Sequence, residues 1–325
     1  MLKVEKLNVS IKMTKGLYPV LENLSFSVER GDTLGIVGES GCGKSMTAMT
    51  LMGLLRKNIK IVSGQINFDG MDLAAFSQKQ YEQIRGKRLS MIFQDSMSSL
   101  NPLIKAGKQI GEAYQIHFGL SGDALDSKIL ESLSSVGFTN PEETRNKYPH
   151  QLSGGQRQRV MIAMAIAGNP ELLIADEPTT ALDVTSQNKI LTLIKNIQSA
   201  SGLAIIIISH DITVISQTCS HVCVMYSGWI VEHGRVKDII GNPKHPYTKA
   251  LIAAIPNDKA KDQELEVIKG SVPSLLQRPK EGCVFAERCK YRMPECSGEI
   301  GNFVLDDGRT VRCILYRYKD GGKEQ

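Results

Sequence analysis

The sequence predicts an α/β fold built around a largely parallel β-sheet. Strand-like and helix-like segments alternate over the first 240 residues. Three of the strand-like segments, 34–38, 171–176 and 203–210, are short apolar runs with little alternation. Strands that are buried on both faces of a parallel sheet have this pattern. Between residues 94 and 167 the composition changes, which indicates a helical insertion between two core strands.

The size and composition of the chain exclude a single small module and argue against a membrane-spanning or nucleic-acid-binding protein. Its 325 residues are enough for one large α/β domain with an appendage, or for two modest domains. The hydrophobic share of 42% is ordinary for a globular protein, and no apolar run approaches the roughly 18 residues that span a bilayer. No export signal is recognisable, so we expect a cytoplasmic protein. A net charge of +5, spread along the chain, does not favour nucleic acid as a partner.

A glycine-rich loop follows the first apolar strand. Residues 38–45, GESGCGKS, fit the pattern G-x-x-x-x-G-K-[ST], in which backbone N–H groups surround phosphate oxygens at the start of a helix. Lys44 is expected to reach the β- and γ-phosphates, and Ser45 to hold Mg²⁺. We interpret Cys42 as part of the loop rather than as a nucleophile. The predicted nucleotide-binding residues of this segment are Gly38, Glu39, Ser40, Gly41, Cys42, Gly43, Lys44, Ser45 and Met46.

A second apolar strand ends in the carboxylates of Asp176 and Glu177. At the C-terminal edge of a strand, one carboxylate can bind the hydration shell of Mg²⁺, and its neighbour can polarise an attacking water. Asp176 is therefore predicted to bind Mg²⁺, and Glu177 to be catalytic. An acidic strand end alone is common, but together with the glycine-rich loop it predicts a nucleotide-hydrolysing site.

The segment LSGGQ, formed by Leu152, Ser153, Gly154, Gly155 and Gln156, resembles the signature motif of ATP-binding-cassette (ABC) proteins. The resemblance implies a RecA-like core with an antiparallel β-subdomain and a helical subdomain, and ATP as the nucleotide. It also implies that two cassettes close head to tail, so that the signature acts in trans on ATP bound by the partner cassette. The segment lies at a predicted helix start, which suits a phosphate.

Three further segments resemble motifs of the same family. Gln94 resembles the glutamine that contacts Mg²⁺ and takes part in catalysis, and His210 resembles the histidine that contacts the γ-phosphate. Ala181, Leu182 and Asp183 resemble the loop that crosses the interface between two cassettes. Tyr18 is a candidate for stacking on adenine, and an ordinary core or surface tyrosine is the alternative.

Residues 93–102, 242–256 and the cysteine-bearing tail resemble the ATPase subunits of bacterial importers of oligopeptides, dipeptides and nickel. This resemblance implies a peripheral subunit on the cytoplasmic face of the membrane. Its implied partners are a second ABC ATPase subunit, two transmembrane permeases and an extracellular solute-binding protein. A paralogue in a heterodimer is usual in the resembled family, and a second copy of this chain stays open. Peptides are the favoured cargo, and nickel or a metal chelate stays open. We expect the ATPase domain at 1–240, with its helical subdomain at about 95–167, and an extension at 241–325.

Two alternative hypotheses assign the chain to other classes of nucleotide-binding protein, and the sequence supports them less well. A soluble ABC ATPase acting on ribosomes or DNA is disfavoured by the single cassette and by the lack of a coiled-coil insertion or a strongly basic arm. A P-loop kinase or GTPase leaves the LSGGQ segment and His210 unexplained. The sequence therefore predicts an ATPase coupled to transport.

Four of the seven cysteines gather in the tail, with the spacing C-x₅-C-x₆-C-x₁₆-C. Thiolates suit soft metals, so an iron–sulfur cluster and structural Zn²⁺ are both chemically reasonable. The absence of close C-x₂₋₄-C pairs favours a [4Fe–4S] cluster over zinc, and the family resemblance implies the same. Disulfides are disfavoured in a reducing cytosol. The predicted ligands, which would stabilise a loop-rich tail, are Cys283, Cys289, Cys296 and Cys313.

Overall fold

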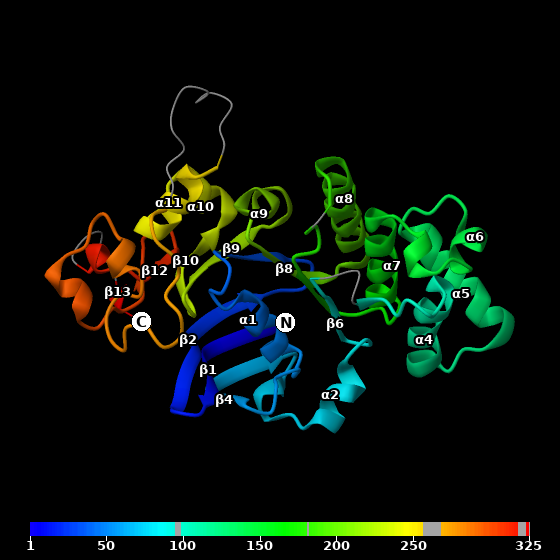
Figure 1. The fold of residues 1–325 in the computed structure, drawn as a ribbon, viewed down its shortest axis with the longest axis horizontal. Coiled ribbons are helices and arrows are strands. Elements are labelled where there is room, and N and C mark those ends of the chain that lie inside the picture. The colour runs from blue at the N-terminus through cyan, green and yellow to red at the C-terminus, as the bar shows by residue number, and fades with distance from the viewer. Residues whose placement is uncertain (95–98, 181, 256–267, 318–322, 325) are drawn as a thin grey trace. The chain divides into compact units, whose positions relative to one another are not determined.

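The computed structural model describes residues 1–94, 99–180, 182–255, 268–317 and 323–324 (Figure 1). The chain forms two compact units. The first consists of Met1–Val28, Thr33–Ala75 and Ser209–Gln325, and the second of Glu29–Asp32 and Phe76–Ile208. In the described part of the chain, no helix has the length and apolar character needed to cross a membrane.

The first unit contains an antiparallel sheet with the strand order β2-β1-β4-β5 (Figure 1). Leu2 of the central strand pairs with Val28 on one side and with Phe68 on the other. Apolar side chains of these strands, such as Leu2 and Val4, are buried while their neighbours are exposed, which gives the sheet one core-facing side. This sheet confirms the expected antiparallel subdomain. The bounds are β1 (Leu2–Met13), β2 (Gly16–Val28), β4 (Ile59–Phe68) and β5 (Met71–Asp72), followed by the 3₁₀ turn η1 (Leu73–Ala75).

The same unit contains mixed-sheet strands in the order β13-β11-β12-β10-β9-β3. Strand β3 is parallel to β9, whereas β9 and β10 form an antiparallel pair. The strands are β3 (Thr33–Val37), β9 (His221–Tyr226), β10 (Trp229–Arg235), β11 (Phe303–Val304), β12 (Thr310–Val311) and β13 (Lys323–Glu324). The helices of the unit are α1 (Lys44–Leu51), α9 (Ile212–Thr218), α10 (Val236–Gly241) and α11 (Pro246–Ala253).

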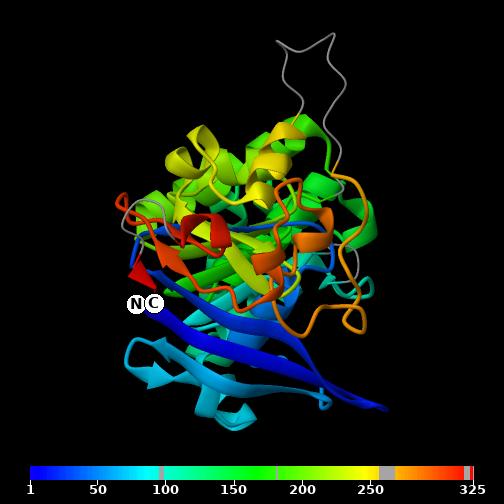
Figure 2. The same cartoon turned by 90° about the vertical axis from the view of Figure 1, so that its left-hand side faces the viewer.

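The C-terminal segment of the first unit, described at residues 242–255, 268–317 and 323–324, is built on strand β10 (Figure 2). Glu232 and His233 pair with Val311 and Thr310 of β12. The guanidinium of Arg312 lies 3.8 Å from the ring centre of Trp229. Turns rather than long helices fill this segment, namely η4 (Ala286–Arg288), η5 (Pro294–Ser297) and η6 (Ile314–Tyr316). The cysteine-bearing tail is therefore continuous with the sheet that contains β3.

The second unit contains three parallel strands, β6 (Leu89–Ile92), β7 (Leu172–Asp176) and β8 (Ala204–Ser209). Every residue of these strands is buried, as the mostly apolar runs at 171–176 and 203–210 predict for β7 and β8. The expected helical insertion lies between β6 and β7. It contains α4 (Ala106–Phe118), α5 (Gly122–Ser135), α6 (Pro141–Arg145), the turn η2 (Pro149–Gln151) and α7 (Gly154–Ile166). Two more helices, α2 (Gln78–Ile84) and α8 (Val184–Ser201), belong to this unit.

Candidate nucleotide-binding site

The glycine-rich loop connects β3 to α1, as its sequence pattern requires. Gly38 lies so close to β9 that an added Cβ would be 2.1 Å from the carbonyl oxygen of Met225. Gly43, the N-cap of α1, has a φ of 113°, a conformation that residues with a side chain rarely adopt. Both positions therefore require glycine, and they bring the loop backbone close to the start of the helix.

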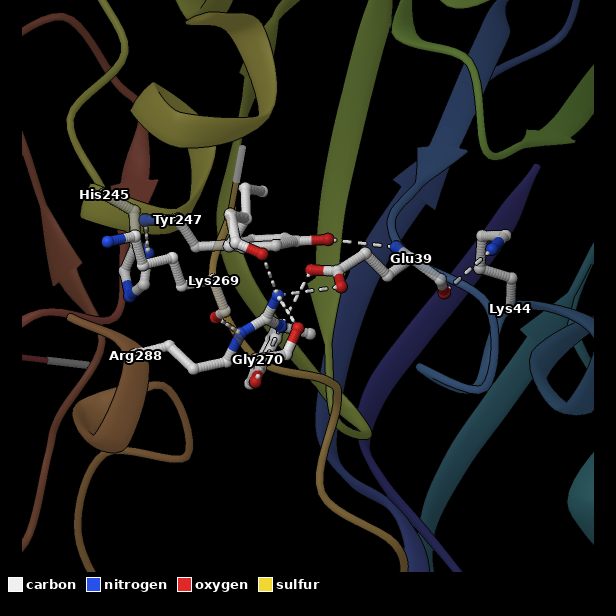
Figure 3. Close-up of polar contacts among 9 residues, drawn as sticks. Glu39, Lys44, His245, Tyr247, Lys269, Gly270 and Arg288 are labelled. Carbon is white, nitrogen blue, oxygen red and sulfur yellow. Dashed lines mark hydrogen bonds and ion pairs between the residues drawn. The ribbon is translucent and has the colours of Figure 1, made fainter. Parts of the chain in front are cut away.

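The side chain of Lys44 is folded back into this loop (Figure 3). Its Nζ donates to the carbonyl oxygen of Gly38 at 2.7 Å and to that of Glu39 at 3.1 Å. Lys44 is 5% exposed. A buried ammonium group at the start of a helix is suited to an anion, because the helix N-terminus adds partial positive charge.

The other predicted residues of the loop differ in accessibility. Ser40 and Gly41 are exposed, whereas Ser45 and Met46, in the first turn of α1, are half-buried. Cys42 is fully buried, and burial raises the pKa of its thiol. A neutral, enclosed thiol is a poor nucleophile, in keeping with the interpretation of Cys42 as part of the loop.

Two more predicted residues lie in the same unit as the loop. Tyr18 is half-buried in β2, opposite Ile11 of β1. His210 is exposed directly after β8, and the next residue, Asp211, caps α9 by accepting a 2.7 Å hydrogen bond from the N–H of Thr213. The assignments of Tyr18 to adenine and of His210 to the γ-phosphate stay predictions.

The second unit brings Gln94 and Glu177 together. Nε2 of Gln94 donates to Oε2 of Glu177 at 3.1 Å, and the hydroxyl of Thr180 donates to the same oxygen at 2.8 Å. Asp176, the last residue of β7, is 2% exposed. Glu177 has a φ of 48°, a strained backbone conformation for a residue other than glycine, and such strain is frequent at functional sites. Thr180 was not predicted from the sequence.

The LSGGQ segment forms the start of α7. Oγ of Ser153 accepts from the N–H of Gln156 at 3.3 Å, and Oε1 of Gln156 accepts from the N–H of Ser153 at 3.0 Å. This reciprocal pair is a capping box, so helix capping accounts for two residues of the motif. Leu152 is 3% exposed and packs in the interior.

Helix capping does not account for the two glycines of the motif. A Cβ at Gly154 would lie 3.4 Å from Leu182, and one at Gly155 would lie 3.5 Å from Ser186, which are ordinary contacts with side-chain atoms. The described fold therefore does not itself require glycine at these positions. Bare backbone at a helix start is instead useful for an external phosphate.

The predicted interface loop is described in part. The N–H of Leu182 donates to the carbonyl oxygen of Thr179 at 3.3 Å. Asp183 caps α8 by accepting a 2.9 Å hydrogen bond from the N–H of Ser186, and this bond lowers the pKa of the Asp183 carboxyl. Ala181 lies outside the described residues.

The four tail cysteines line one small cavity of about 10 Å³, together with His245. All seven cysteines of the chain are free thiols. Burial raises the pKa of Cys283 and Cys289, and it raises the pKa of Cys313 to about 12.

Among the residues that the structure describes, no group of three or more His, Cys, Asp or Glu side chains could hold a metal ion. The expected metal-binding extension is therefore not supported by the described residues. The four thiols do lie around one cavity. The spacing of cysteines in the sequence, however, does not determine the ligand geometry that a metal needs.

Two further side chains, which no sequence pattern predicts to be part of the site, contact the glycine-rich loop. Tyr247 and Arg288 both bind Glu39 (Figure 3). Both residues lie in segments that the sequence linked to importers, but nothing in those segments indicates a contact with Glu39, which is more than 200 positions away in the chain.

Comparison with known proteins agrees with these features. The family model described as "ABC transporter" matches residues 21–180, and the one described as "Oligopeptide/dipeptide transporter, C-terminal region" matches residues 231–296. The dipeptide transport ATP-binding protein DppD of Bacillus subtilis (strain 168) is 45% identical, covering 97% of this chain and 94% of the relative. The oligopeptide transport ATP-binding protein AppD of the same organism is 42% identical, covering 100% and 99%.

A solved structure shares the fold. The ATP-binding cassette MJ0796, described as a dimer in a post-hydrolysis state bound to ADP and Pi, superposes with a TM-score of 0.65 at 28% identity. The match covers 73% of this chain and 99% of that chain. The strand, loop and helix order around Lys44, the LSGGQ capping box and these relatives lead to one conclusion: the chain belongs to the ATP-hydrolysing ATP-binding proteins of the ABC transporter family.

Proposed function

We propose that this chain is the ATP-hydrolysing subunit of an importer that carries peptides across the cytoplasmic membrane. One observation carries this proposal: relatives named for dipeptide and oligopeptide transport align over almost the whole chain, including its C-terminal region. These names favour peptides over nickel or a metal chelate, and they favour a transporter over a ribosome- or DNA-directed ATPase. The proposed boundaries are 1–240 for the ATPase domain and 241–325 for the extension.

The phosphate groups of ATP would be bound by the loop 38–45. Its backbone N–H groups and the helix start of α1 provide hydrogen bonds and partial positive charge, and Lys44 provides a full charge. Ser45 and Asp176 would supply the oxygen donors that Mg²⁺ prefers. When bound, Mg²⁺ neutralises charge that develops on the phosphates.

Glu177 would act as the general base for the attacking water. Its Oε2 accepts from both Gln94 and Thr180, and these two bonds fix the orientation of the carboxylate. Gln94 would also contact Mg²⁺, and His210 would contact the γ-phosphate. Tyr18 would stack on the adenine.

The LSGGQ segment would bind ATP held by a second ABC ATPase subunit, because its glycines are not required by the fold of this chain. A paralogue is the proposed second subunit. Two permeases and a solute-binding protein complete the proposed importer, with this chain at the cytoplasmic face of the membrane. The loop of Leu182 and Asp183 would lie at the interface between the two ATPase subunits.

Replacing Glu177 with Gln is expected to preserve ATP binding and to slow hydrolysis by about 10² to 10⁴, the usual contribution of a positioned base. Gln retains the shape of the side chain and an oxygen that can accept from Thr180. Phosphate release should therefore fall while ATP-dependent dimerisation, measured by size-exclusion chromatography, increases. Near-normal phosphate release by the assembled transporter would contradict the assignment of Glu177.

A double variant supplies the control for this experiment. Gly154→Asp adds a negative side chain at the start of α7, where the described contacts leave room for a Cβ. Combined with Glu177→Gln, it should keep ATP binding to the monomer and lose the ATP-dependent dimer, because the added carboxylate repels the phosphate of the partner's ATP. Loss of ATP binding by the monomer would instead place the LSGGQ segment in cis.

Cells that lack this chain are expected to lose uptake of labelled di- and oligopeptides while Ni²⁺ uptake is unchanged. The unaltered chain should restore peptide uptake. The Lys44→Ala variant should not, because the loop then lacks its buried ammonium group. Loss of Ni²⁺ uptake with normal peptide uptake would identify the metal as cargo.

We also propose that Cys283, Cys289, Cys296 and Cys313 bind a [4Fe–4S] cluster, with Zn²⁺ as the alternative. The described geometry does not itself form a metal site. The support is the donor set alone: four thiols line a single cavity, and thiolates are the usual ligands of such clusters. Burial opposes ionisation of Cys283, but the nearby Arg312 guanidinium favours its thiolate. When bound, the cluster would cross-link the loops of the tail.

Protein purified without oxygen should accordingly contain about four iron and four sulfide per chain, the composition of such a cluster. Cys289→Ser should lose this metal and retain ATP binding. Cys219→Ser is the matched control, because Cys219 lies outside the tail and should leave the metal content unchanged. Colourless protein with one zinc per chain would decide for zinc, and protein without metal would contradict both proposals.

A further inference from the structure

Glu39, the second residue of the glycine-rich loop, is held from three sides (Figure 3). Its carbonyl oxygen accepts from Nζ of Lys44 at 3.1 Å, and its N–H donates to the hydroxyl oxygen of Tyr247 at 2.9 Å. Its carboxylate accepts two hydrogen bonds from the Arg288 guanidinium, Nη1 to Oε1 at 3.0 Å and Nη2 to Oε2 at 3.1 Å. Glu39 therefore links the predicted phosphate-binding lysine to two residues of the C-terminal segment.

All three guanidinium nitrogens of Arg288 donate hydrogen bonds. Nε donates to the carbonyl oxygen of Lys269 at 2.9 Å, and Nη1 donates to the hydroxyl of Tyr226 at 3.2 Å. Nη2 reaches the carbonyl oxygens of Ile268 and Gly270 at 3.3 and 3.2 Å. The side chain is 7% exposed, against 28% for Glu39. A two-pronged, largely buried ion pair of this kind fixes geometry, and removing one partner leaves the other charge without compensation.

The turn that carries Arg288 is packed against the end of strand β9. Arg288 ends η4, between Cys283 and Cys289, and the N–H of Ala286 donates to the carbonyl oxygen of Cys283 at 3.0 Å. The ring of Phe285 lies 5.2 Å from the ring of Tyr226 in an edge-to-face arrangement. Because these rings are buried, the cysteine-bearing tail holds Arg288 in one place.

Tyr247 is positioned by a separate chain of hydrogen bonds. Glu232 of β10, which is fully buried, accepts from the N–H groups of Lys244 and His245 at 2.9 and 2.8 Å. His245 caps α11, and its Nδ1 accepts from the N–H of Tyr247 at 3.0 Å. The hydroxyl that receives the N–H of Glu39 is therefore fixed from the β10 side of the unit.

The C-terminal segment also holds the strand that carries Tyr18. Nη1 of Arg278 donates to the carbonyl oxygens of Pro19 and Val20 at 2.9 and 3.4 Å, and it reaches Oε1 of Glu22 at 3.3 Å. The Arg278 side chain is 5% exposed. Two buried arginines of one segment thus contact the phosphate loop and the backbone next to the candidate adenine-stacking residue.

We infer that the C-terminal segment positions the nucleotide site, and that Arg288 is a positioning residue which sets ATP affinity through Glu39. The inference rests on the proposed binding of ATP phosphates by the loop 38–45. Pairing with Arg288 keeps the Glu39 carboxylate turned to the C-terminal segment and neutralised. Without Arg288, the carboxylate would stand uncompensated beside a polyanionic ligand, and the loop would lose one of its three anchors.

The dissociation constant of a fluorescent ATP analogue, measured on the full chain, tests this inference. Arg288→Ala should raise Kd by about 5- to 150-fold, the usual range for coupling between two sites. Adding Glu39→Gln to Arg288→Ala should restore most of the lost affinity, because the uncompensated carboxylate is removed. The single Glu39→Gln variant completes the cycle and should bind more tightly than Arg288→Ala.

Two further variants separate positioning from general damage. Arg292→Ala is the matched control: it removes an arginine of the same tail whose ion pair with Glu287, at 2.8 Å, is exposed. Its Kd should be unchanged. Tyr247→Phe keeps the buried ring and removes only the acceptor of the Glu39 N–H, so it should raise Kd. This variant tests the inference if Arg288→Ala does not fold.

An unchanged Kd in folded Arg288→Ala would overturn the inference, as would an Arg288→Ala defect that Glu39→Gln does not relieve. If Arg288→Ala does not fold, an unchanged Kd for Tyr247→Phe would overturn it. Lys44→Ala distinguishes this result from failure of the proposed site. Normal ATP binding by Lys44→Ala would contradict the proposed site itself. If Lys44→Ala loses ATP binding while the Kd of Arg288→Ala is unchanged, only the positioning role is contradicted.

Discussion

The proposed nucleotide site depends on the glycine-rich loop, and Glu39 is the residue through which this loop is bound to the C-terminal segment. The close approach of Gly38 to Met225 fixes one end of the loop, and the N-cap conformation of Gly43 fixes the other. Between them, the backbone and side chain of Glu39 bind Lys44, Tyr247 and Arg288. A loop prepared in this way loses little conformational freedom when phosphates bind, and preorganised N–H groups are the basis of anion binding at a helix start.

The C-terminal segment is in direct contact with the glycine-rich loop. The segment belongs to the same compact unit as the loop, its strand β12 pairs with β10, and its arginines contact the loop and strand β2. A tail that only enlarged the protein would not need two buried arginines directed at the ATPase core. We therefore regard it as a structural component of the proposed nucleotide site.

The parts of the fold that the sequence predicts are those whose cause is local. Apolar runs predicted β7 and β8, and the glycine-rich pattern predicted the β3–loop–α1 order, because burial and helix capping act over a few residues. The contact of Arg288 with Glu39 joins residues 249 positions apart, and no periodicity marks either of them. Thr180 is local to Glu177, but its bond depends on the conformation of the turn after β7, which the sequence pattern does not show. The cysteine spacing predicted a metal cluster, which the described residues do not support. The four thiols line one cavity, but ligand geometry depends on how the turns pack, and spacing does not determine it.

We infer that the C-terminal segment keeps Glu39 in place when the loop binds nucleotide. The most direct measurement is an experimental structure of the full chain with Mg²⁺ and a non-hydrolysable ATP analogue. We expect Nζ of Lys44 to leave the carbonyl oxygens of Gly38 and Glu39 for the phosphate oxygens. The Glu39 carboxylate should stay paired with Arg288. A structure in which Glu39 has turned away from Arg288, with the nucleotide bound in the loop, would contradict the account.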